Sequence, residues 1–183
     1  MKLLIKDARL AFPQLFEAQT VNGEGEPAFS AVFLLPKNHP QIADINKAID
    51  SVAKEKWGAK ADDILAKMRA GDKTALHNGD LKSEYDGFAG QLYISARNKT
   101  RPTVIDRDKT PLVQADGKPY GGCYVVGSIE FWAQDNKYGK RVNASLRGVQ
   151  FLRDGDSFAG GGAASEDEFE DLGEGAEADF DLA

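Results

Sequence analysis

The chain has 183 residues, 42% of them hydrophobic and 28% charged, which is the profile of a soluble globular protein with one ordinary core. A single cysteine excludes an intramolecular disulfide and favours a reducing compartment, and two histidines leave little for a His/Cys zinc cluster. The sequence contains neither an apolar run of membrane-spanning length nor a signal-peptide pattern, so we expect a cytoplasmic protein.

The net charge of −6 hides an asymmetry between the body of the chain and its C-terminus. Eleven of the 29 acidic residues lie from residue 154 onward, where there is no Lys or Arg. Residues 1–153 therefore hold 18 acidic and 23 basic residues, and the basic excess is concentrated after residue 90. A basic body joined to an acidic tail indicates a protein that works on nucleic acid.

Two strands are predicted within residues 1–35. The apolar segment of residues 2–12 is expected to end at Pro13, and the glycines within residues 21–27 indicate a turn. Residues 28–35 form the second strand, and their continuous apolar run predicts burial on both faces.

Two helices are predicted next. Asn38 is the expected N-cap, with Gln41 at the capping-box position, and Trp57-Gly58 ends the first helix. Its buried stripe is expected to consist of Ile42, Ile45, Ile49 and Val52. A shorter helix over residues 60–69 stops before Gly71.

From residue 90 the pattern returns to strands. Residues 91–97 alternate, with Leu92, Ile94 and Ala96 on the inward face. Residues 120–134 give the longest strand signal, and their inward face is expected to hold Val125, Gly127, Ile129 and Phe131. A hairpin loop over residues 135–140 leads to a last strand whose inward residues are Val142, Ala144 and Leu146. Several strands with inserted helices predict a mainly β fold, a small barrel of the oligonucleotide-binding (OB) type.

The C-terminus is predicted to be a separate region. We place the domain at residues 1–158, with a helical insertion at about 38–70, and a Gly-rich linker with a disordered acidic tail at residues 159–183. The tail region nevertheless keeps Phe158, Phe169 and Phe180, which solubility alone does not require.

Enzymatic motifs are weak. There is no Gly-rich loop ending in Gly-Lys-Ser/Thr, and the pattern at Gly23 and Gly25 lacks the third glycine of a dinucleotide site. Cys123 lies inside an apolar strand, where we expect a structural thiol. One catalytic alternative stays open, an Mg²⁺-dependent nuclease with the residues Asp106, Asp108, Asp116 and Lys118.

A binding function uses more of the sequence. Single-stranded nucleic acid needs aromatic faces for its bases and cations for its phosphates, and no cofactor or metal. Such side chains fall on outward strand positions or in the loops of the basic half. The predicted contact residues are Tyr93, Arg97, Lys99, Arg101, Arg107, Lys109, Lys118, Tyr124, Trp132, Lys137, Tyr138, Lys140, Arg141 and Arg147.

The acidic tail suggests how binding of nucleic acid could be regulated and coupled to a partner protein. An anionic strand with aromatic residues can occupy a cationic groove while nucleic acid is absent, and then dock on a basic patch of a partner protein. The predicted partner-binding residues are Phe169, Asp179, Phe180 and Asp181. Two alternatives stay open: a tail that only maintains solubility, and a tail that mimics DNA to occupy a host enzyme.

Several motifs also resemble a family of phage proteins. They are Asn78-Gly79-Asp80, Tyr85 with Gly87, Ala96-Arg97, Arg101-Pro102, Val104 with Asp106, Tyr120-Gly121-Gly122-Cys123-Tyr124-Val125, Asp135-Asn136 with Gly139, Gly148-Val149-Gln150-Phe151 and Arg153-Asp154-Gly155. The family, long catalogued as a domain of unknown function, is associated with phage single-stranded DNA-binding proteins of OB fold, similar in plan to the replication proteins of short-tailed phages. The similarity covers roughly residues 1–158.

This resemblance implies sequence-independent binding of single-stranded DNA during phage replication, recombination or repair, inside the bacterial host cell. It also implies an acidic tail that recruits a polymerase, helicase or recombination protein; here Leu182 and Ala183 extend beyond the terminal aromatic residue. RNA binding and a homodimer stay open.

Overall fold

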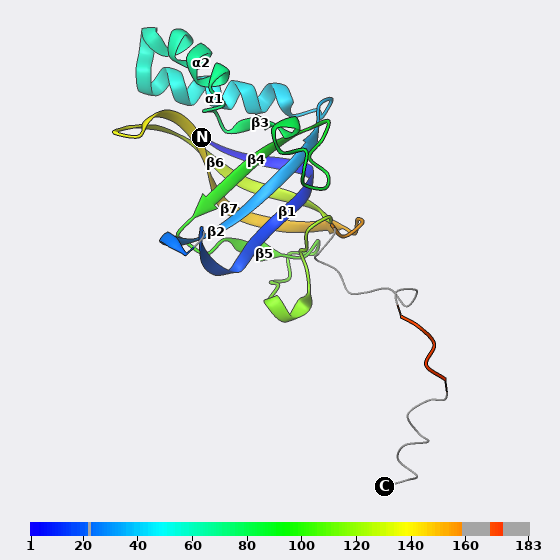
Figure 1. The fold of residues 1–183 in the computed structure, drawn as a ribbon. Helices are drawn as coiled ribbons and strands as arrows, with labels where there is room; N and C mark the ends of the chain where they lie inside the picture. Colours follow the sequence, from blue (N-terminus) through cyan, green and yellow to red (C-terminus); the bar gives the residue numbers. More distant parts are fainter. Residues whose placement is uncertain (22, 159–168, 174–183) are drawn as a thin grey trace.

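A closed five-stranded barrel dominates the computed structural model, which describes residues 1–21, 23–158 and 169–173 (Figure 1). β1 pairs antiparallel with β2 and β6, β2 with β4, and β6 with β7, and a parallel pairing of β4 with β7 closes the ring. The barrel strands are β1 (Lys2–Val21), β2 (Glu24–Pro36), β4 (Gln91–Asn98), β6 (Tyr124–Asn136) and β7 (Gly139–Arg153). This barrel confirms the predicted OB-like architecture.

Two short strands extend the sheet outside the ring. β3 (Leu76–Asn78) lies antiparallel to β4, and β5 (Thr103–Ile105) lies parallel to β7. The connections contain two single turns of 3₁₀ helix, η2 (Gly79–Lys82) and η3 (Gln114–Asp116). The first of these turns begins a loop that matters for the candidate site.

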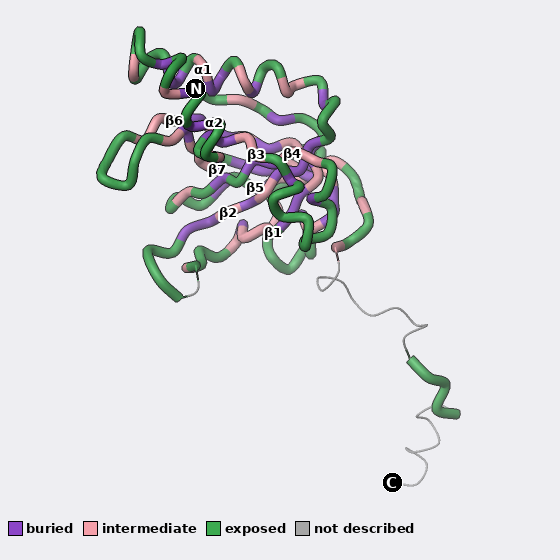
Figure 2. The backbone as a smooth tube through the Cα atoms, turned by 45° about the horizontal axis from the view of Figure 1, so that its top comes forward, coloured by how far each residue is buried: buried purple, intermediate pink, exposed green. Residues whose placement is uncertain are grey.

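The predicted alternation in β4, β6 and β7 is confirmed, and it fills the barrel. Ile94, Ile129 and Leu146 are fully buried, and the tube is purple along the inner strand positions (Figure 2). Gly127 shares this inward face, and the ring of Phe33 lies so close that a Cβ atom at this position would be 2.5 Å from it. The inner wall is therefore packed too tightly there for any side chain.

Pro13 does not end the first strand, contrary to our expectation. β1 continues to Val21, and its pairing with β2 shifts register between Ala11 and Gln14. Phe12 adopts a φ of 46° at this bulge, a conformation that side-chain-bearing residues seldom take. A proline is tolerated in a strand at such a bulge because its missing N–H falls where ladder bonding is interrupted.

Both predicted helices are present and cover one end of the barrel (Figure 1). They are α1 (Ile42–Trp57) and α2 (Ala61–Ala70), joined by the 3₁₀ turn η1 (Gly58–Lys60). Ile45, Ile49 and Val52 are buried as expected, whereas Ile42 is partly exposed. Neither these helices nor any other helix in the described part of the chain has the length and apolar character to cross a membrane.

The predicted capping box at Asn38 is wrong. The residue preceding α1 is Gln41, and no side chain caps the helix. The Gln41 side chain instead accepts from the backbone N–H of Lys6 and donates to the carbonyl of Leu4, both at 2.7 Å. It thereby bonds the helix entrance to β1, a tertiary use of the side chain that competes with local capping.

Candidate nucleic-acid interface

The outer surface of β1, β2 and β4 presents side chains in rows that cross the three strands. One row runs from Arg9 through Leu34 to Tyr93. Another runs from Gln14 through Ser30 to Arg97, where the Ser30 hydroxyl donates to the Gln14 side chain. Arg97 is exposed and forms no ion pair within the described residues.

A loop of residues 79–90 folds over the first row. It places Phe88, 1% exposed, against Tyr93, with ring centroids 5.3 Å apart. The base of the loop is closed where the Asp80 carboxylate accepts from the N–H of Gly90 at 2.7 Å. This bond, and then the charge of Lys37, lowers the pKa of Asp80.

Two aromatic rings remain exposed on this face, Phe12 at 51% and Tyr85 at 44%. Their centroids are 5.1 Å apart in an edge-to-face arrangement, and each ring also lies within 6 Å of buried Phe88. The exposed rings are therefore held on buried Phe88, so little side-chain entropy would be lost if a flat ligand stacked on them. Sequence reasoning did not assign either residue to the site, although Phe12-Pro13 marks the bulge that turns the ring outward.

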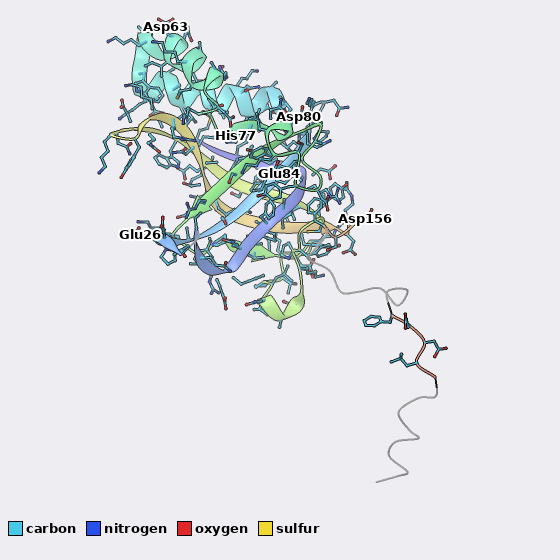
Figure 3. The ribbon with its side chains drawn as sticks, in the orientation of Figure 1. Glu26, Asp63, His77, Asp80, Glu84 and Asp156 are labelled. Atoms are coloured by element: carbon cyan, nitrogen blue, oxygen red, sulfur yellow. The ribbon has the colours of Figure 1, made fainter. Side chains whose placement is uncertain are left out.

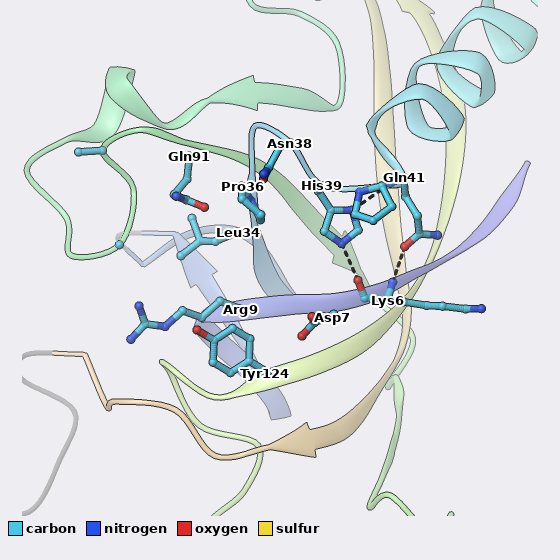
Figure 4. A pocket seen from close by; sticks show the side chains of 13 residues that line it. Lys6, Asp7, Arg9, Leu34, Pro36, Asn38, His39, Gln41, Gln91 and Tyr124 are labelled. Carbon is cyan, nitrogen blue, oxygen red and sulfur yellow. Dashed lines mark hydrogen bonds between the residues drawn. The ribbon is translucent and has the colours of Figure 1, made fainter.

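A groove of about 700 Å³ lies beside this aromatic pair, next to β1 (Figure 4). Lys6, Arg9 and Tyr124 line it. The Arg9 guanidinium donates to the carbonyls of Gly122 and Asp156, at 3.1 and 2.7 Å, which fixes its direction. Figure 4 shows Arg9 and Tyr124 close together at one end of the groove.

A row of alternating cations and an aromatic ring continues from Arg9 onto β6 and β7. Arg9 of β1 lies opposite Tyr124 of β6 in the strand register, and Tyr124 lies opposite Arg153 of β7. The Arg153 guanidinium lies 4.1 Å from the centre of the Tyr124 ring and also pairs with Asp7 at 2.7 Å. Asp7, an acidic residue of the groove, is thus neutralised by this ion pair.

The chain leaves β7 along the edge of the same groove. The Phe158 N–H donates to the carbonyl of Gly121, and the Phe158 ring lies 4.3 Å from the Arg9 guanidinium. Gly122, with a φ of 107°, permits this close approach, since a Cβ there would collide with the carbonyl oxygen of Asp156. The segment that carries the C-terminal tail therefore starts beside the groove, at the side where Asp156 is labelled in Figure 3.

These features form one continuous surface along β1. The Arg101 guanidinium donates to the carbonyl of Phe16 at 2.9 Å, which holds it against the later part of that strand. We call the surface the barrel-face track and define it by Arg9, Phe12, Tyr85, Arg97 and Arg101. Cations at both ends and paired rings between them are the combination that single-stranded nucleic acid binds.

The predicted contact residues divide among three regions. Arg97 and Arg101 belong to the track, and Tyr124 lines the adjoining groove. Lys99, next to them in sequence, is paired with Glu26, whose pKa it lowers. Tyr93 faces outward as predicted but is only 4% exposed, so it supports Phe88 and offers no free face; this burial, and then Asp72, raises its pKa.

The other predicted residues lie away from the track. Trp132, Lys137, Tyr138, Lys140 and Arg141 belong to the β6–β7 hairpin, which reaches toward α1, and the Trp57 Nε1–H donates to Asp135 at 3.0 Å. Arg147 projects from β7 and is paired with Glu130 at 3.0 Å. Arg107, Lys109 and Lys118 lie in the connection from β5 to β6.

The proposed nuclease residues do not assemble into a metal site. The Asp108 carboxylate accepts from the N–H of Thr110, and the Asp116 carboxylate from the N–H of Val113. Asp106 is paired with Lys118 at 2.9 Å, which lowers the pKa of the acid and raises that of the lysine. Within the described residues no three His, Cys, Asp or Glu side chains are grouped to hold a metal ion. Local turn formation accounts for this acidic pattern.

Cys123 is the buried structural thiol that the sequence predicts. It is fully buried, and this burial raises its pKa to about 11, so the thiol stays protonated and unreactive at neutral pH. Of the predicted tail residues, Phe169 is described and is 71% exposed. Asp179, Phe180 and Asp181 lie outside the described residues.

Comparisons with known proteins concern the family and the fold of the chain. Residues 1–181 match the family described as "Enterobacter phage Enc34, ssDNA-binding protein". Protein p50 of Acyrthosiphon pisum secondary endosymbiont phage 1 is 50% identical over 175 residues, which are 94% of each chain.

Among solved structures, the single-stranded DNA-binding protein of bacteriophage Enc34 in complex with ssDNA has a TM-score of 0.74. It is 28% identical, and the match covers 86% of this chain and 89% of that one. The bacteriophage T7 single-stranded DNA-binding protein gp2.5 has a TM-score of 0.56 at 14% identity, covering 93% of this chain and 97% of that one. The similarity to the T7 protein concerns the fold alone.

Proposed function

Because this chain belongs to the family of phage single-stranded DNA-binding proteins represented by that of Enterobacter phage Enc34, we propose that it binds single-stranded DNA along the barrel-face track. The observation that carries the proposal is the exposed pair Phe12 and Tyr85, held on buried Phe88. The arginines of the track follow the phosphates on either side of the stacked bases.

Sequence independence follows from the chemistry of the track. Every base offers a π-face to Phe12 and Tyr85, and Arg97 meets phosphate whatever the base. The groove beside Tyr124 lengthens the surface and accepts further nucleotides. Affinity then falls with salt, by roughly 0.7 in log K per log unit of salt for each phosphate neutralised.

In the cell, this activity protects DNA strands exposed during phage replication, recombination and repair inside the bacterial host. The acidic tail recruits a polymerase, helicase or recombination protein through its aromatic and acidic residues, among them Phe169, Asp179, Phe180 and Asp181. It also competes with DNA, because it departs at Phe158, beside Arg9. The predicted cations outside the track serve as secondary contacts for longer strands.

The test is fluorescence anisotropy of a labelled oligo-dT, titrated with full-length protein at low and moderate salt. We expect tight binding to the single strand, much weaker binding to a duplex of the same length, and no dependence on Mg²⁺. Equal affinity for single strand and duplex would contradict the proposal. Tighter binding after tail removal supports the competition; unchanged affinity contradicts that part.

A further inference from the structure

A second surface, separate from the barrel-face track, lies at the helical end of the molecule. α2, the end of α1 and the β6–β7 hairpin enclose a groove of about 620 Å³. Its apolar floor is formed by Trp57, Ile64 and Met68. The bond from Trp57 Nε1 to the Asp135 carboxylate holds the hairpin against α1 and so keeps the groove in shape.

The rim of this groove is entirely cationic. It consists of Lys60, Lys67, Lys73 and Lys140, and no acidic residue lines the groove. Lys140 is 3.6 Å from Asp135, and the other three lysines form no ion pair within the described residues. A ring of ammonium groups around an apolar floor fits a ligand that has both carboxylates and large apolar side chains.

The chain itself carries two such segments. Residues 168–172 read Glu-Phe-Glu-Asp-Leu, and residues 179–182 read Asp-Phe-Asp-Leu, so an acidic motif with Phe and Leu occurs twice. In the first motif Phe169 is 71% exposed and Leu172 is 93% exposed. These side chains are therefore not packed on their own domain.

The groove and the origin of the tail lie at opposite ends of the barrel. β7 begins in the hairpin beside the groove and runs fifteen residues before the chain leaves it at Arg153 (Figure 1). A contact between the tail of one copy and the groove of another would join two different surfaces. Such a head-to-tail contact extends into a linear array when its rotation does not close into a ring.

We propose that the Lys-rimmed groove binds the acidic Phe-Leu motifs of a second copy of this chain, and that this contact makes DNA binding cooperative. The Phe and Leu side chains enter the apolar floor, and the flanking carboxylates meet the lysines. The cooperativity, though not the docking, rests on the proposed function. The same tail would then bind either the groove of a second copy or another protein, and not both at once.

The docking is tested without DNA. A fluorescein-labelled peptide of residues 166–183 is titrated with the full-length protein at low salt, and its anisotropy is measured. We expect saturable binding, weakened at least tenfold by Lys67→Glu with Lys73→Glu. The matched control, Lys47→Glu with Lys54→Glu, changes the same charge on exposed positions of α1 outside the groove and should alter affinity less than twofold.

Two further arms identify the occupant. A peptide with Phe169→Ser and Phe180→Ser keeps every charge and should bind at least fivefold more weakly; equal binding would mean simple charge attraction and overturn the proposal. If the wild-type peptide binds only to a full-length chain that carries these same two substitutions, and the wild-type chain excludes it equally at every protein concentration, the groove is occupied by the chain's own tail. That result would overturn the assignment to a second copy.

The cooperativity is tested on oligo-dT by gel shift. The variant with Lys67→Glu and Lys73→Glu should keep its affinity for an oligonucleotide that accommodates one copy and lose cooperativity on a long one. Equal loss of affinity on both would show that the lysines contact DNA and would overturn the proposal. Failure of the proposed function is a separate result, because it removes DNA binding and leaves the peptide titration unchanged.

Discussion

The barrel-face track and the β6–β7 hairpin both expose aromatic rings beside cations, yet they differ in what lies beneath. Phe12 and Tyr85 contact each other and buried Phe88. Trp132 and Tyr138 are 44% and 76% exposed, and within the described residues no aromatic ring contacts either of them. From this comparison we infer that an exposed ring serves best as a stacking platform when buried neighbours already hold it in place.

The cations outside the track also differ among themselves in whether a carboxylate neutralises them. Arg97 of the track and Lys137 and Arg141 of the hairpin form no ion pair within the described residues, whereas Lys140 is paired with Asp135 and Arg147, farther along β7, with Glu130. A paired cation must give up its carboxylate before it can neutralise a phosphate. The number of basic residues in a region therefore overstates its affinity for DNA.

The largest effect should come from the double substitution Phe12→Ala with Tyr85→Ala. We expect the affinity for oligo-dT to fall by about 30-fold or more, because each stacked base is worth roughly 1–3 kcal/mol. The measurement is anisotropy at fixed salt. Trp132→Ala with Tyr138→Ala is the matched control, and a loss as large in the control would reverse our ranking of the two regions.

A smaller effect separates the free cation from the paired one. Arg97→Gln should weaken binding by about 3- to 10-fold and reduce the salt slope by roughly 0.7, the value for one phosphate contact. Arg147→Gln should change the slope much less, since Glu130 already neutralises that guanidinium. Titrations at several salt concentrations measure both slopes, and identical slopes for the two variants would contradict the distinction.

The strained backbone of the track allows a test of stability apart from binding. Phe12 has a φ of 46°, so Phe12→Gly should be more stable than Phe12→Ala by about 0.5–1 kcal/mol. Neither variant has the ring, and both should bind DNA equally weakly. Urea unfolding measures the difference. If the alanine variant were the more stable of the two, the bulge would not impose this conformation.

The smallest effect concerns Cys123, which lies behind the track. Its backbone carbonyl accepts a hydrogen bond from the backbone N–H of Leu10 in β1. Its raised pKa of about 11 means that the folded state holds the thiol proton more tightly than the unfolded chain. The stabilisation is complete below the ordinary thiol pKa and is lost as pH rises toward 11. At pH 8 a thiol reagent should react slowly with native protein and rapidly in urea; fast native reaction would indicate that the β1–β6 seam opens.

Much of the fold was predictable because it depends on local patterns. The period-two alternation placed Ile94, Val125 and Leu146 inside the barrel, and the helical period located α1 and α2 to within a few residues. The site was less predictable. Tyr93 and Arg97 are both outward on β4, but a loop covers one and leaves the other exposed, which no alternation pattern reports.

The amino-acid sequence by itself determined the β-rich barrel, the inserted helices, the charge division between body and tail, and through its motifs the family. These properties follow from composition, from hydrophobic periodicity and from short motifs, all of which can be recognised without the tertiary structure. Tertiary structure alone decided that Pro13 marks a bulge, that Phe12 turns outward beside Tyr85, and that Gln41 bonds β1 instead of capping a helix. Each of these depends on strand register or on contacts between residues far apart in the sequence, such as Lys6 and Gln41, which are 35 positions apart, so no local pattern predicts it.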